Sequence, residues 1–124
     1  MQKKNLATFE LIRKLQDEFG FNRNMIGIAG LKDKQGVTSQ WISLPKRDVQ
    51  KLCGGINNLL AYLRKICKVI TATYGSKLLK LGDNAGNKFE IILRPTRGEI
   101  RKQKELIESV MQQIDKEGVP NYFG

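Results

Sequence analysis

The chain has 124 residues, a length that suits one compact domain or a piece of one. Its 22 lysines and arginines against 12 acidic residues give a formal charge of +10, which favours a polyanionic partner such as nucleic acid, although lysine-rich surfaces also serve solubility. It contains no histidine, which excludes Ser-His-Asp and Cys-His nucleophilic sites and histidine-ligated metals. No run approaches the roughly 20 apolar residues that span a bilayer and no secretory signal is visible, so the cytoplasm is the expected location.

The spacing of apolar residues predicts four helices. The first begins at Thr8, a good N-cap residue, and stops at Gly20. A short helix over Arg47–Leu52 follows Pro45, and a third contains residues 59–66. The longest runs from Glu99 to Glu117, with one apolar side made of Ile100, Ile107, Val110, Met111 and Ile114.

Four other segments have the composition of β-strands. Met25–Ala29 is a short apolar run, and the alternating segment Val37–Leu44 is a suitable hairpin partner for it. Lys68–Tyr74 is rich in β-branched residues, and Lys88–Leu93 ends before a proline. Helices and strands interleave without the regular rhythm of a parallel sheet. We therefore expect an α+β fold with an antiparallel sheet.

The segment Ala29-Gly30-Leu31-Lys32-Asp33-Lys34 places one carboxylate in a tight connection after a buried strand. The two flanking lysines favour the ionised form of Asp33, which would make it a nucleophile or a base rather than a proton donor. Such a turn, taken alone, is more often a solvated hairpin tip.

A second polar segment runs from the glycine loop at Gly82 and Gly86 into the expected strand at Lys88–Leu93. Period-two alternation puts Asn87 and Phe89 on the same face, where an amide and an aromatic ring could read and stack a base. The simpler alternative is that Phe89 belongs to the core and Asn87 to a turn.

These segments, in this order, resemble conserved blocks of the TruD family of tRNA pseudouridine synthases. The resemblance covers nearly the whole chain, and it includes Asn5, Thr8, the Ala29–Lys34 stretch with Val37, Thr38 and Gln40, Lys80-Leu81-Gly82, Gly86-Asn87-Lys88-Phe89, Arg94 and Gly118-Val119-Pro120-Asn121-Tyr122-Phe123-Gly124.

The resemblance implies that Asp33 is the catalytic residue, and that Asn87 and Phe89 lie in the active-site cleft near the target base. It also implies a reaction without metal or cofactor, in which Asp33 attacks the ribose C1′ or removes a proton from the sugar. Most members of the family modify uridine thirteen of tRNA, so the implied substrate is a folded RNA. The base must leave its stack, which gives Phe89 a stacking role and Lys32 and Lys34 a role in clamping the RNA backbone.

The sequence departs from the family pattern in three places. Nothing before Asn5 resembles the family's N-terminal strand with its functional basic residue, the chain stops inside the motif that contains Tyr122-Phe123-Gly124, and Gly36 stands where alanine is usual. We therefore expect a single domain over residues 1–124 that is an incomplete part of a larger catalytic domain. Two alternatives remain open, namely an RNA-binding fragment without turnover and a structural or partner-binding domain.

Overall fold

A computed structural model describes residues 1–92, 94 and 100–119. Within the described residues are four α-helices, one 3-10 turn and four short strands in two antiparallel sheets, which confirms the expected α+β class. The chain divides into two compact units, Met1–Asn87 and Lys88–Gly124, which are considered separately below.

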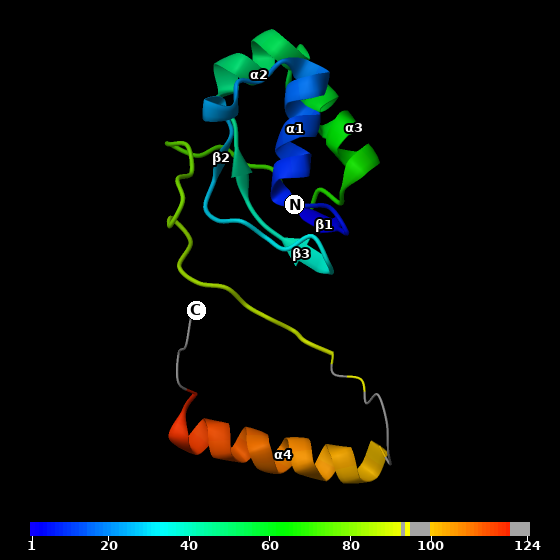
Figure 1. The fold of residues 1–124 in the computed structure, drawn as a ribbon. Helices are drawn as coiled ribbons and strands as arrows, with labels where there is room; N and C mark the ends of the chain where they lie inside the picture. Colours follow the sequence, from blue (N-terminus) through cyan, green and yellow to red (C-terminus); the bar gives the residue numbers. More distant parts are fainter. Residues whose placement is uncertain (93, 95–99, 120–124) are drawn as a thin grey trace. The chain divides into compact units, whose positions relative to one another are not determined.

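The first unit contains both sheets. Strand β1 (Gln2–Lys4) pairs with β3 (Val37–Ser39), and β2 (Gly27–Ile28) pairs with β4 (Ile42–Ser43), both in antiparallel fashion (Figure 1). The pairing of β2 with β4 confirms the expected association of the two runs. The first run is shorter than expected because Arg23–Met25 forms a 3-10 turn (η1). Strand β1 was not predicted, since its residues are polar.

The core of this unit forms where helix α1 (Thr8–Phe19) packs on the strands and on α3 (Ile56–Ile66). The Phe19 ring meets the Tyr62 ring edge to face with 5.1 Å between centroids, and the Tyr62 hydroxyl donates to the carbonyl oxygen of Lys14. These contacts hold α1 and α3 side by side. The buried apolar residues are Met1, Leu11, Ile12, Leu15, Phe21, Ile26, Ile28, Val49, Cys53, Leu59 and Leu63.

The helix predictions hold to within a few residues at each end. Helix α2 (Lys46–Cys53) begins directly after Pro45, and both α1 and α2 end at a glycine in the left-handed region. The prediction of Thr8 as an N-cap was wrong. Ala7 takes that position, and its N–H donates to the Glu10 carboxylate, which leaves the Thr8 hydroxyl available for other bonds.

Two strand predictions were wrong. Lys68–Tyr74 contributes only a single bridge, between Gln2 and Lys68, and residues 88–92 of the predicted strand Lys88–Leu93 form no ladder, while residue 93 lies outside the described residues. Composition alone cannot make a strand, because its backbone groups need a partner edge. Among the described residues, 69–74 and 88–92 have no such partner.

The second unit contains helix α4 (Ile100–Glu117). Its start agrees with the prediction to one residue, and Glu99 lies outside the described residues. Side chains on its predicted apolar side, such as Ile107, Val110 and Met111, are 40–50% exposed within the described structure. Among the described residues no helix is both long and apolar enough to cross a membrane.

Candidate active site

Asp33 lies in the connection that leaves β2 and leads to β3. It is exposed and outside any helix, and no described residue donates a hydrogen bond to its carboxylate. This placement agrees with the predicted connection between antiparallel strands, because β2 pairs with the later β4. The carboxylate is therefore open to a ligand, while the backbone beneath it is held from several sides.

Thr8 anchors one side of this loop. Its hydroxyl accepts the backbone N–H of Lys32 at 3.0 Å and donates to the Gln40 side-chain oxygen at 2.9 Å. The bond to Gln40 links the first turn of α1 to the residue that follows β3. A residue that looked like a helix cap therefore fastens the loop to two elements.

Lys3 anchors the loop from below. Its ammonium donates to the carbonyl oxygens of Leu6 (2.6 Å), Lys32 (3.2 Å) and Asp33 (3.0 Å). Burial lowers the pKa of Lys3 from its ordinary 10.5, the charges of Asp33 and Glu10 act to raise it, and the like charge of Lys32 lowers it. The ammonium thus lies within electrostatic reach of the Asp33 carboxylate. Sequence reasoning missed Lys3, since nothing in a Lys-Lys pair says which lysine is buried.

A second loop is joined to the Asp33 loop. The Gly82 N–H donates to the Ala29 carbonyl oxygen at 2.9 Å, and the Lys32 ammonium donates to the side-chain oxygen of Asn87. Gly82 has φ of 91°, a left-handed conformation that glycine adopts without strain. The structure therefore brings Asn87 to Lys32, the residue next to Asp33.

Gly27 allows the second loop to approach β2 closely. A β-carbon at Gly27 would lie 2.6 Å from the carbonyl oxygen and 2.8 Å from the nitrogen of Leu79. The Leu79 N–H also donates to the Ser43 hydroxyl at 2.8 Å, so the 79–82 segment lies directly against β2 and β4. The missing side chain is what lets the second loop reach Ala29.

Lys34 and Phe89 take no part in the hydrogen bonds described above. The Lys34 ammonium pairs with the Glu10 carboxylate at 2.6 Å, and the two side chains are 58% and 43% exposed. The Lys34 hydrogen bond, followed by that of the Ala7 N–H, lowers the pKa of Glu10 from its ordinary 4.5.

Phe89 belongs to the second unit, where it is 72% exposed and outside any strand. Its predicted place at the start of a strand beside Asn87 was wrong.

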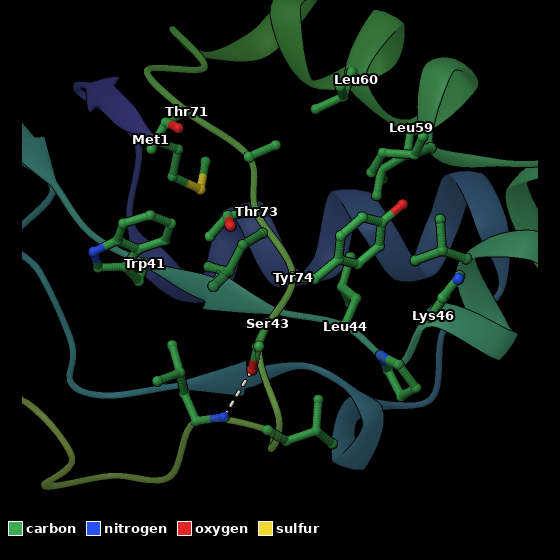
Figure 2. Close-up of a pocket in the computed structure, with 18 of the residues that line it drawn as sticks. Met1, Trp41, Ser43, Leu44, Lys46, Leu59, Leu60, Thr71, Thr73 and Tyr74 are labelled. Carbon is green, nitrogen blue, oxygen red and sulfur yellow. Dashed lines mark hydrogen bonds between the residues drawn. The ribbon is translucent and has the colours of Figure 1, made fainter.

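A hollow in the first unit lies away from the Asp33 loop. It has a volume of about 590 Å³ and lies between β4, α2, α3 and residues 71–79, with Trp41, Lys46 and Tyr74 among its lining (Figure 2). None of the residues predicted for the site lines it. Its walls are mostly apolar, and the Lys46 ammonium lies 5.2 Å from the centroid of the Tyr74 ring. No aspartate or glutamate is among the described residues that line it, so they offer no carboxylate for acid–base work.

The cysteines are free thiols, with Cys53 buried and Cys67 half-buried. Burial raises the pKa of both thiols from 9.0, and the N-terminal amino group partly offsets this at Cys67. Within the described residues, no three acidic, cysteine or histidine side chains are grouped as metal ligands.

Comparisons with known proteins identify the class to which this arrangement belongs. The family model described as tRNA pseudouridine synthase D (TruD) matches residues 1–124. The tRNA pseudouridine synthases D of Thermus thermophilus and Aquifex aeolicus are 34% and 30% identical to this chain over 124 residues. The matched residues are all of this chain but 32% and 30% of those two proteins. A crystal structure assigned to TruD of Methanosarcina mazei superimposes with a TM-score of 0.73 at 27% identity, covering 99% of this chain and 27% of that one.

The chain belongs to the TruD family. It spans about a third of the length of the curated relatives that it matches.

Proposed function

We propose that this chain is part of a tRNA pseudouridine synthase that isomerises uridine in tRNA, with Asp33 as the catalytic carboxylate. The observation that carries the proposal is the Asp33 loop, whose backbone is held by Lys3 and Thr8 while the carboxylate is left exposed. Reactions that depend on one group need it fixed in place yet open to the substrate. Membership of the TruD family supports uridine in tRNA as that substrate.

The reaction breaks the bond between C1′ and N1, turns the base, and joins C1′ to C5, from which a proton is lost. An ionised carboxylate can promote this in two ways. It can attack C1′ and hold the ribose as an ester while the base turns, or it can take a proton from the sugar and return it later. Both routes use Asp33 as a carboxylate.

Asn87 and Lys34, which belong to the same unit as Asp33, offer other contacts that a flipped uridine needs. Asn87, fixed by the Lys32 ammonium, presents an amide for the base edge. The exposed ring of Phe89 is available for stacking. Lys34 can exchange its exposed Glu10 partner for an RNA phosphate at little cost, because exposed ion pairs are worth about 0–1 kcal/mol.

The test is Asp33→Asn in the full-length protein, assayed by tritium release from C5 of labelled uridine in tRNA. The amide keeps the size of the carboxylate but can neither attack C1′ nor accept a proton at neutral pH. We expect turnover to be abolished and the Kd for tRNA to stay within a few-fold of normal.

Asp83→Asn is the matched control. Asp83 is also a carboxylate in a glycine-flanked loop, but among the described residues it accepts the Lys80 N–H alone, a bond that an amide oxygen can keep. Asp83→Asn should retain turnover. Near-normal tritium release from Asp33→Asn would remove both the catalytic assignment and the function built on it.

A further inference from the structure

One charged side chain of the first unit is buried where solvent cannot reach it. Lys3 is 1% exposed, although it lies in a strand of only three residues at the beginning of the chain. Burying an ammonium is unfavourable unless its protons are all hydrogen-bonded. The Lys3 ammonium has three protons and three carbonyl acceptors, on Leu6, Lys32 and Asp33, so its hydrogen-bonding capacity is filled.

Two of these acceptors are the carbonyls of consecutive residues, Lys32 and Asp33. Because peptide groups are planar, holding both carbonyls fixes the peptide planes on either side of the Asp33 α-carbon. The direction in which the Asp33 side chain leaves the backbone is then set by Lys3. The Thr8 hydroxyl adds a third fixed point at the Lys32 N–H.

We propose that Lys3 is a positioning residue for the reaction, whose ammonium holds the Lys32 and Asp33 carbonyls so that the Asp33 carboxylate stays aimed at the substrate. The inference rests on the proposed function of Asp33. Lys3 itself, being buried beneath the loop, contacts the Asp33 backbone carbonyl rather than the substrate. Strand β1, which pairs with β3, thereby becomes part of the catalytic apparatus.

The test compares Lys3→Met with Lys4→Met in the full-length protein. Methionine keeps most of the lysine stem and removes all three donors, and at the neighbouring exposed Lys4 the same change alters charge alone. We expect kcat of Lys3→Met to fall by about tenfold to a hundredfold, the range that small misplacements of reacting groups produce. Its KM and its Kd for tRNA should stay within a few-fold of wild type, and Lys4→Met should match wild type in kcat.

A merely structural role for Lys3 predicts a different result. Lys3→Met would then change the melting temperature while the folded protein kept its kcat. A folded Lys3→Met with wild-type kcat therefore overturns the proposal. The two hypotheses fail separately, since turnover by Asp33→Asn refutes the function, whereas an inactive Asp33→Asn beside a fully active Lys3→Met refutes only the role of Lys3.

If Lys3→Met does not fold, NMR of lysine side-chain nitrogens in the folded wild type and in Asp33→Asn decides the matter. We expect one slowly exchanging ammonium signal at neutral pH, assigned to Lys3, that shifts when the Asp33 charge is removed. The lack of any protected ammonium signal, or one indifferent to Asp33→Asn, overturns the proposal.

Discussion

Replacing Gly27 by alanine should loosen the join between the two loops of the candidate site. The new β-carbon would lie 2.6 Å from the Leu79 carbonyl oxygen, where ordinary contacts begin at 3.4 Å, so the Leu79 backbone must retreat by about 0.8 Å. Such overpacking costs about 1–3 kcal/mol, and stretching the Leu79 bond to Ser43 adds up to about 1 kcal/mol. Alanine also reduces the conformational entropy of the unfolded chain, which offsets about 0.4–1 kcal/mol of this loss. Taking the middle of each range, we expect a net loss of stability of about 2 kcal/mol.

Urea unfolding followed by tryptophan fluorescence measures this loss as a lower midpoint with an unchanged slope. Gly86→Ala is the matched control, because a β-carbon at Gly86 meets nothing within 4 Å and its φ is not in the left-handed region. It should stay within about 0.5 kcal/mol of wild type. Hydrogen exchange at the Gly82 amide, which bonds to Ala29, should quicken in Gly27→Ala. Wild-type stability together with unchanged Gly82 protection would refute the close-approach argument.

Two further predictions concern titrating groups. Folding lowers the pKa of Glu10 below its ordinary 4.5. The ionised Glu10 carboxylate therefore stabilises the folded state fully above pH 4.5, and this stabilisation is lost as the pH falls through the pKa of the folded state. Glu10→Gln should therefore be less stable than wild type at neutral pH, with the gap in urea midpoints closing below pH 4.5, whereas a gap that widens in acid contradicts this sign. Cys53 and Cys67, whose pKa values lie above 9.0, should react slowly with a thiol reagent at neutral pH until urea unfolds the chain, and rapid native labelling of both would contradict their burial.

The helices could be predicted from sequence because their signals are local. Pro45 fixes the start of α2, while Gly20 and Gly54 close α1 and α2 in the left-handed conformation. A pattern of apolar residues three and four positions apart predicts a helix without any information on which residues the helix contacts. The loop that carries Asp33 was also predictable, since its glycines and charges lie between two strand-like runs.

The strands and anchors could not be predicted in the same way because they depend on distant partners. The segment 68–74 has strand composition but only one bridging residue, whereas the polar Gln2–Lys4 is a strand because β3 is beside it. Lys3 bonds to carbonyls 29 and 30 positions away, and Thr8 to a residue 24 positions away. Such residues look ordinary in sequence, and the interpretation of Thr8 as a helix cap hid its role in holding the Asp33 loop.

The three lysines around Asp33 differ in burial, and in the proposed function this difference separates two demands on the site, RNA binding and catalysis. Binding RNA requires cations that can change partners, and the exposed Lys34, paired with Glu10, can do so without any movement of the loop backbone. Catalysis requires the opposite, a carboxylate whose position does not follow the movements of the RNA. Lys3 cannot reach a phosphate, because all its donors are committed below the loop. Phosphate contacts can therefore form and break at Lys34 while the peptide that carries Asp33 stays where Lys3 holds it.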